Sequence, residues 1–177
     1  MKLRPVGEDK VIITPGKMKP YKFPAGFVMI VDTREQLPLF TPTDHPEGLC
    51  VLQKALKNGD YSIKGYEHLF AIERKQVSDF FGYCGKERTR TTMKMERFRD
   101  MVQAGGFVGL VIEATESDLL SGYYKSTLSA EVIRQALVSF EIRYHINIFY
   151  SRSRADIARW MLDRAIKFYR ISLEDNS

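Results

Sequence analysis

The chain has 177 residues, of which 44% are hydrophobic and 28% are charged, and its net charge is +5. A chain of this length and composition is expected to fold around a core rather than remain disordered. No apolar run approaches the roughly 20 residues that cross a bilayer, and the N-terminal residues lack the apolar core of a signal peptide. We therefore expect a cytoplasmic protein, or a nuclear one in a eukaryote. The basic excess favours a polyanionic partner such as nucleic acid.

The first half of the chain predicts an arm followed by strands. Residues 1–25 contain four prolines among scattered lysines, which indicates an extended arm with one short edge strand at 10–14. Apolar runs predict strands at 27–32 and 68–74, and a shorter strand begins at residue 61. The segment from residue 49 has a helix-like pattern that breaks at the turn signal Asn58-Gly59. The strand at 61–63 follows this turn and the strand at 68–74 comes next, so these two strands are expected to pair as a hairpin. Residues 34–48 are rich in proline and turn formers and predict a loop.

The second half alternates helices and strands. It predicts helices at 77–83, 95–104, 128–145 and 151–170, strands at 107–114 and 146–150, a polar basic connection at 84–94, and a loop or broken helix at 115–127. This alternation indicates an α/β fold with a mixed central sheet flanked by helices. We expect one domain over residues 26–177. Cys50 and Cys84 have no metal-type spacing and are expected to be free thiols.

Acidic residues gather near the ends of three predicted strands. They are Asp32 and Glu35 around Arg34, Asp60 after Gly59, and Glu73 and Asp79 around Arg74 and Lys75. Two or three carboxylates suffice for magnesium, which prefers oxygen ligands and retains several waters. A tight hairpin can place Asp60 and Glu73 side by side, with the carbonyl of Arg74 nearby. Lys75 lies two residues beyond Glu73 and points to the same face, where it could hold an attacking water or neutralise phosphate charge.

An Asp followed by Glu-x-Lys is the site pattern of the PD-(D/E)xK nuclease superfamily, and the longer pattern resembles the XPF-type (ERCC4-domain) structure-specific endonucleases. Their signature is Gly-Asp, a variable stretch, Glu-Arg-Lys, three residues and Asp. This chain has Gly59-Asp60, Glu73-Arg74-Lys75 and Asp79, and the upstream VDxRE element of the family stands at 31–35. The resemblance covers about residues 27–150 and implies a restriction-endonuclease-like fold.

The resemblance also implies an activity, namely cleavage of DNA phosphodiester bonds near branches or junctions, in repair or recombination, with Mg²⁺ or Mn²⁺ as cofactor. It implies that Asp32, Asp60 and Glu73 bind the metal and that Lys75 is catalytic. Arg34 and Arg74 match family arginines near the catalytic site, and arginine suits a phosphate contact. Glu35 and Asp79 match the motif, and Asp79 would orient Lys75 or Arg74.

The resemblance also implies an oligomeric state. Members of the XPF-type family dimerise through the nuclease domain, so we expect a homodimer or heterodimer. The amphipathic segments 128–145 and 155–170 are the candidate dimer interface. Family members usually carry tandem helix-hairpin-helix repeats after the nuclease domain. Only about 27 residues follow the last predicted strand here, so we expect no such module, and a partner or dimerisation would then supply junction specificity, or the specificity would differ.

A basic segment adds a candidate DNA-binding surface. Residues 86–99 contain Lys86, Arg88, Arg90, Lys94, Arg97 and Arg99. We expect Lys86, Arg88, Arg90 and Lys94 to contact DNA together with Arg34 and Arg74. The alternative is an ordinary solvated face.

Other functions share this pattern. The main alternative is a catalytically silent DNA-binding or dimerisation subunit of the same fold, although such subunits lose the carboxylates or the lysine that are all present here. A restriction-type or recombination-type nuclease is a second alternative. A protein-interaction module with structural acids is a third, and it predicts no magnesium binding.

Overall fold

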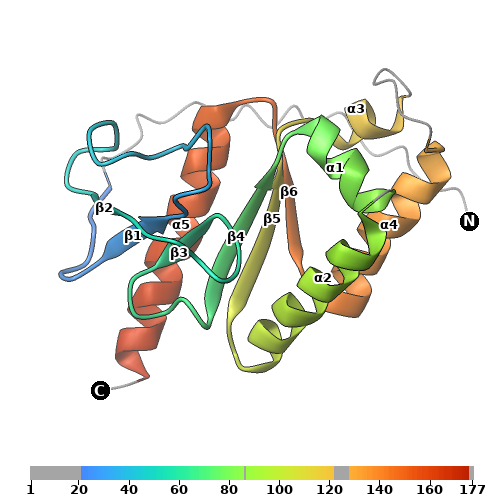
Figure 1. Cartoon of the computed structure of the whole chain (residues 1–177). Helices are drawn as coiled ribbons and strands as arrows, with labels where there is room; N and C mark the ends of the chain where they lie inside the picture. Colours follow the sequence, from blue (N-terminus) through green and yellow to red (C-terminus); the bar gives the residue numbers. More distant parts are fainter. Residues whose placement is uncertain (1–20, 86, 122–127, 176–177) are drawn as a thin grey trace, which may run out of the picture.

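A six-stranded mixed sheet forms the centre of the computed structural model, which describes residues 21–85, 87–121 and 128–175 (Figure 1). The strands are β1 (Val28–Val31), β2 (Cys50–Gln53), β3 (Tyr61–Ile63), β4 (Phe70–Lys75), β5 (Phe107–Ile112) and β6 (Asn147–Tyr150). Their order across the sheet is β2-β1-β3-β4-β5-β6. Only β3 is antiparallel to its neighbours, so the other five strands all point the same way.

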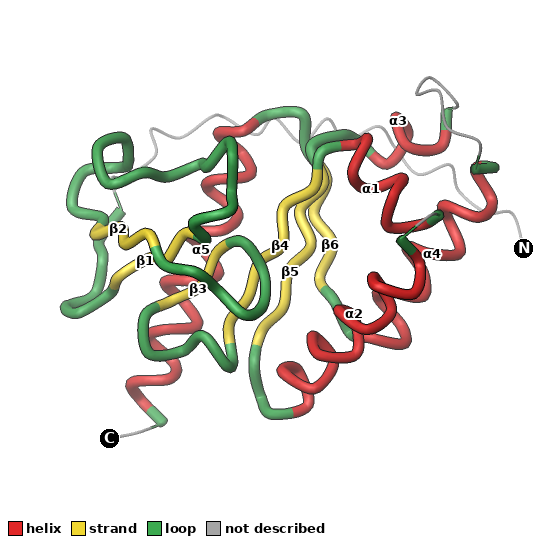
Figure 2. Tube along the Cα trace, in the orientation of Figure 1, coloured by secondary structure: helices red, strands yellow, loops and turns green. Residues whose placement is uncertain are grey.

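Helices cover both faces of the sheet. They are α1 (Val77–Cys84), α2 (Arg88–Gln103), α3 (Glu116–Leu120), α4 (Ala130–Tyr144) and α5 (Arg154–Glu174). Helix α5 packs on one face through an apolar cluster with β1, β3 and β4, and α1, α2 and α4 pack on the other face (Figure 2). The predicted class, a mixed sheet flanked by helices, is confirmed.

The side chains of β4 alternate between two apolar clusters, one on each face of the sheet. Phe70 and Ile72 face α5, whereas Ala71 faces α1 and α2. Successive side chains of a strand point to opposite faces, so Glu73 lies on the α1/α2 side and Arg74 on the α5 side. The functional motif is therefore divided between the two faces of the sheet.

The predicted hairpin of β3 and β4 is confirmed by the antiparallel pairing of Tyr61 with Ile72. The helix-like interpretation of the segment after residue 49 is wrong, because Cys50–Gln53 is strand β2, paired in parallel with β1. Its side chains are mostly exposed at the sheet edge. Backbone pairing with β1, which the local pattern does not reveal, decides the conformation there.

The predicted connection over 84–94 is also wrong in part, because α2 already begins at Arg88. Thr91, Met95 and Phe98 form a buried stripe at helical spacing, and this stripe extends the helix toward its N-terminus. The predicted edge strand at 10–14 and residues 122–127 lie outside the described residues. Cys50 and Cys84 are free thiols, as expected. Within the described ranges, no helix has the length and apolarity needed to cross a membrane.

Candidate active site

Four acidic side chains come from one edge of the sheet. Asp32 follows β1, Glu73 lies near the end of β4, and Glu113 follows β5, while Asp60 precedes the antiparallel strand β3. A backbone hydrogen bond joins two of them directly, since the N–H of Asp32 donates to the carbonyl of Asp60 at 2.8 Å. The carboxyl ends of parallel strands are the usual place for ligand binding in such sheets.

Asp60 is held in place by the neighbouring strand. Its backbone N–H donates to the carbonyl of Ile72 at 2.8 Å, and its Oδ2 accepts from the backbone N–H of Arg74 at 2.8 Å. Gly59 makes this approach possible, because its φ is +71° and an added Cβ would lie 3.0 Å from the Ile72 carbonyl oxygen. Burial, and then the charge of Glu73, raise the pKa of Asp60 to about 7.

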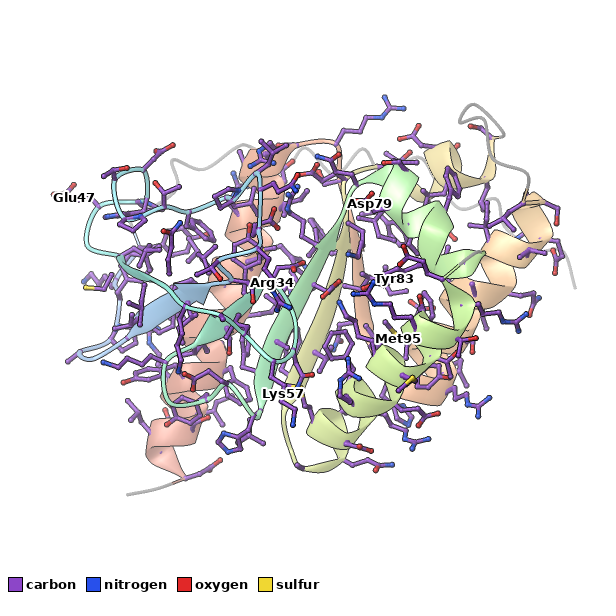
Figure 3. All side chains as sticks on the ribbon, in the orientation of Figure 1. Arg34, Glu47, Lys57, Asp79, Tyr83 and Met95 are labelled. Atoms are coloured by element: carbon purple, nitrogen blue, oxygen red, sulfur yellow. The ribbon has the colours of Figure 1, made fainter. Side chains whose placement is uncertain are left out.

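Glu73 is at the centre of a cluster on the α1/α2 side of the sheet. We call Glu73, Lys75, Tyr83 and Lys94 the Glu73 cluster. Glu73 is fully buried, and its Oε1 lies 2.9 Å from the ammonium of Lys75 and 2.6 Å from that of Lys94. The hydroxyl of Tyr83 donates to the same oxygen. Figure 3 labels Tyr83 on α1 and Arg34, which lie on opposite sides of β4 in that view.

The cations decide the charge states within this cluster. Burial alone would raise the pKa of Glu73, but Lys94 and Lys75 outweigh it and lower that pKa. Burial alone would lower the pKa of Lys75, but Glu73 outweighs it and raises that pKa. The Lys75 ammonium also lies 4.6 Å from the ring centroid of Tyr83. Lys75 is therefore a cation and a hydrogen-bond donor, not a neutral base.

Arg74 is at the centre of a second cluster, which comprises Glu35, Arg74, Glu113 and Arg154. The guanidinium of Arg74 is nearly buried and lies 2.6 Å from Glu35 and 2.6 Å from Glu113. Burial alone would lower the pKa of Arg74, but these two carboxylates raise it. Arg154 at the start of α5 contacts Glu113 at 2.9 Å. The Arg74 cluster thus connects the loop after β1, the sheet and α5.

Asp32 is occupied by Arg34. Arg34 donates to both carboxylate oxygens of Asp32 at 2.8 Å, and the backbone N–H of Leu56 donates to Oδ2 at 2.6 Å. These bonds, led by those from Arg34, lower the pKa of Asp32 to about 2. The Arg34 side chain is 73% exposed, whereas that of Asp32 is buried. The guanidinium therefore covers the carboxylate from the solvent side.

The donor set for a metal ion is incomplete in this arrangement. Across the described parts of the chain, no group of three or more His, Cys, Asp or Glu residues is placed to hold a metal ion. The expected set of Asp32, Asp60 and Glu73 is therefore not assembled as one cluster. Two of its members do fit a divalent cation, because Asp60 and Glu73 are neighbours and the buried Oε2 of Glu73 has no hydrogen-bond partner.

The expected DNA contacts occupy different places. Arg88 and Arg90 are exposed on α2, Lys94 is partly buried against Glu73, and Lys86 lies outside the described residues. A cavity of about 180 Å³ adjoins the Glu73 cluster, and its lining comprises Lys75, Tyr83, Glu87, Arg90, Thr91 and Lys94. Asp79 is exposed in the first turn of α1, where its charge acts on Lys75.

Three site residues were not found from the motif. Tyr83 had no distinguishing signal, because an aromatic residue on a short helix is usually a core residue. Glu113 did have a signal, since it directly follows an apolar strand as Asp32 does. The contact of Lys94 with Glu73 joins residues 21 positions apart, and only the helix that begins at Arg88 brings them together.

Comparison with known proteins gives both a family and a fold. A family model for the ERCC4 domain matches residues 31–163. Two solved structures of XPF from Aeropyrum pernix are similar. The one in complex with DNA has a TM-score of 0.57 at 19% identity, covering 83% of this chain and 65% of that chain. The other has a TM-score of 0.58 at 20% identity, covering 81% and 60%.

At these identities the two structures establish the fold alone, and the chain spans less than two thirds of either. No curated protein sequence matches the chain. The family model, in contrast, matches most of the chain and includes the whole run from Gly59 to Asp79. As the motif predicted, the chain belongs to the ERCC4 domain family.

Proposed function

We propose that the protein is a metal-dependent endonuclease that hydrolyses phosphodiester bonds in branched or junction-containing DNA, in repair or recombination. Membership of the ERCC4 domain family supports a structure-specific DNA nuclease. One of the similar XPF structures is a complex with DNA. The finer features, namely Mg²⁺ or Mn²⁺ dependence and flap or fork substrates, are part of the proposal.

A single observation supports catalysis rather than binding alone. The Oε2 atom of Glu73 is buried without a hydrogen-bond partner, next to Asp60 and within a cluster of cations. An unsatisfied buried carboxylate oxygen costs free energy, and a cation bound there would offset that cost. We propose Asp60 and Glu73 as the metal ligands, with Asp32 as a third ligand when the guanidinium of Arg34 leaves it.

Each remaining residue of the motif has a role in this proposal. Lys75 would donate a hydrogen bond to the attacking water and orient it. Arg34 is exposed and would bind a DNA phosphate once it leaves Asp32. The buried ion pair of Arg74 and Glu35 would hold the loop after β1, which follows Asp32, against β4. Asp79 would orient Lys75.

The reaction would be an in-line displacement at phosphorus. A bond would form between the water oxygen and phosphorus while the bond from phosphorus to the 3′ oxygen breaks. The water would lose its proton to solvent and the leaving 3′ oxygen would take one from solvent, so the products are a 5′ phosphate and a 3′ hydroxyl. A bound Mg²⁺ or Mn²⁺ would lower the pKa of the water and stabilise the charge that develops on the phosphate. The exposed Arg88 and Arg90 of α2 would bind the backbone of the DNA next to the site.

We also propose dimerisation through the helices after β5. Val138 and Ile142 stand one turn apart on the outer side of α4, and Ile142 is 73% exposed. Sedimentation of the wild type and of Ile142→Glu at high concentration tests this, and a monomer in both would remove the proposal. We further propose that residues 26–177 form a single domain.

Cleavage of end-labelled DNA tests the main proposal. Flaps, forks, splayed arms and plain duplex would be incubated with Mg²⁺ or Mn²⁺ and with wild type, Asp60→Asn or the control Asp44→Asn, which changes an exposed loop residue. We expect metal-dependent cuts near the junction for the wild type and the control, and none for Asp60→Asn. Equal cutting by Asp60→Asn would refute the assignment of the site.

One observation favours the silent DNA-binding or dimerisation subunit instead. Asp32 is covered by Arg34, and Oε1 of Glu73 is saturated by Lys75, Lys94 and Tyr83, so much of the acidic charge is already neutralised. If the wild type binds the same branched DNAs tightly but cuts none of them in either metal, this second function would be established.

A further inference from the structure

Glu73 has more cationic partners than one carboxylate needs. Its Oε1 lies within 2.9 Å of two ammonium groups, those of Lys75 and Lys94, and it also accepts from Tyr83. A divalent cation at Glu73 would add two positive charges within a few ångströms of both lysines. Like charges at such a distance in a buried site repel strongly, so both lysines and a cation cannot share this carboxylate in the present arrangement.

The two lysines differ in how they are held. Lys75 lies on β4, two residues from Glu73 on the same face, and its side chain is 18% exposed. Lys94 comes from α2, and its side chain is 28% exposed. Both lysines line the cavity of about 180 Å³ next to the cluster, but the lining residues Arg90 and Thr91 are on the helix of Lys94, and Glu87 is its N-cap. Lys94 is therefore the more exposed partner and the one whose own helix borders the cavity.

The cavity offers Lys94 a second anion. Glu87 also lines it, seven residues before Lys94, which is about two helical turns. Thr91 lies between them and contributes a buried hydroxyl oxygen without a hydrogen-bond partner. A Lys94 ammonium that leaves Glu73 can thus find a carboxylate at the N-cap of its own helix and a free acceptor within that helix.

We propose that Lys94 is an exchangeable counter-ion of Glu73, which holds the carboxylate while no divalent cation is bound and turns into the cavity beside α2 when one binds. This inference depends on the proposed metal site at Asp60 and Glu73. It has a thermodynamic consequence, since Lys94 and the cation compete for one carboxylate. Removal of the Lys94 charge must then raise the intrinsic affinity for the cation and weaken the cation-free protein.

Binding of Mn²⁺, measured by titration calorimetry without DNA, tests the competition. Lys94→Gln and Arg90→Gln form a matched pair, because each replaces a cation of the same cavity with the same neutral amide, but only Lys94 contacts Glu73. We expect Lys94→Gln to bind Mn²⁺ about tenfold more tightly than the wild type, within the usual range of coupling between two sites. Arg90→Gln is expected to change the affinity by less than about threefold, since it acts only through long-range charge.

Two further variants separate the possible failures. Lys94→Arg keeps the charge and is expected to restore the wild-type affinity, which a merely damaged fold would not do. Glu73→Gln is expected to abolish binding. If Glu73→Gln abolishes binding but Lys94→Gln binds as the wild type does, the exchange is refuted and the metal site stands. If Glu73→Gln binds Mn²⁺ as the wild type does, the metal site and the exchange are both refuted.

The cation-free protein gives a second measure. In EDTA, we expect Lys94→Gln to melt at a lower temperature than Arg90→Gln, because only the former removes a partner of the buried Glu73. Saturating Mn²⁺ is expected to close most of this gap. A gap that is unchanged by Mn²⁺ would contradict the exchange, because Lys94 would then support Glu73 in both states.

Discussion

Asp60, just before β3, and Glu73, on the neighbouring strand β4, bear the same functional group, yet the protein shifts their pKa values in opposite directions. Glu73 has two lysines within 2.9 Å, whereas the side chain of Asp60 has one backbone N–H donor. Burial and the charge of Glu73 raise the pKa of Asp60 to about 7 from an ordinary 3.8. Opposite shifts of two neighbouring carboxylic acids are typical of functional sites.

The shift at Asp60 predicts how stability depends on pH. Between about pH 4 and pH 7 the folded state binds a proton that the unfolded state has released, so the free energy of unfolding falls as pH rises. Asp60→Asn removes this penalty, so it should stabilise the protein in EDTA by on the order of 4 kcal/mol at pH 8 and by less than half as much at pH 5. Urea unfolding at both pH values measures the difference. The exposed Asp44→Asn serves as the control, and a gain at Asp60 that is the same at both pH values would contradict the prediction.

Two ion pairs with the same N···O distance differ in how deeply their side chains are buried. Arg74–Glu35 and Arg134–Glu131 both measure 2.6 Å, but the first pair is nearly buried and the second is at least half exposed. Loss of the Glu35 carboxylate would weaken two charge-assisted hydrogen bonds to the buried guanidinium of Arg74 and leave Glu113 as its remaining carboxylate partner. Glu35→Gln should therefore lower the free energy of unfolding by about 3 kcal/mol, whereas Glu131→Gln should lower it by less than ~0.5 kcal/mol. Equal losses in urea unfolding would show that Arg74 finds another partner.

At the scale of the element, the turn before β3 places Asp60. Gly59 and Gly65 both have positive φ values, +71° and +87°, but an added Cβ would lie 3.0 Å from the Ile72 carbonyl oxygen at Gly59 and would contact nothing within 4 Å at Gly65. Alanine at either position would therefore strain the backbone, but only alanine at position 59 would also clash with a neighbouring strand.

We expect Gly65→Ala to cost only the strain of the left-handed backbone, about 1 kcal/mol. Gly59→Ala should cost about 2–3 kcal/mol and should also weaken Mn²⁺ binding, because the clash displaces Asp60 from β4. Thermal unfolding and Mn²⁺ titration of both variants measure this. Unchanged Mn²⁺ affinity in a destabilised Gly59→Ala would show that the turn does not set the position of Asp60.

The elements also show what the sequence could and could not predict. The β3–β4 hairpin was predictable because the turn signal at Asn58-Gly59 marks the start of β3 and the two apolar runs are close together in the sequence. Strand β2 was not, because its conformation comes from pairing with β1 across 22 residues, as in Val28 with Cys50. The motif predicts Asp60, Glu73 and Lys75 as site residues from their order alone, and the structure places Glu73 beside Lys75 and Asp60 beside Arg74. It could not identify Lys94, whose place depends on where α2 begins.

At the scale of the whole molecule, the positive charge of α2 lies next to the Glu73 cluster. Arg88 and Arg90 are exposed there, and each phosphate that they neutralise would release counterions. Replacing both by Gln should weaken DNA binding for all sequences and should reduce the slope of log affinity against log salt by about two. Arg134, on α4, provides the control, since Arg134→Gln should leave the slope unchanged. A double variant with an unchanged slope would place the DNA elsewhere.

The packing of α5 has a consequence for the synthesis of the protein. This helix covers the face of β1, β3 and β4, and its first residue, Arg154, bonds to Glu113 and to the carbonyls of Leu37 and Pro38. It follows every strand along the chain, so a ribosome completes the whole sheet before the helix that covers one face of it has emerged. The nascent chain must keep that apolar face away from other proteins during this interval. The Arg74 cluster also lacks its fourth member, Arg154, until then, so this ion-pair cluster is completed only after α5 has emerged.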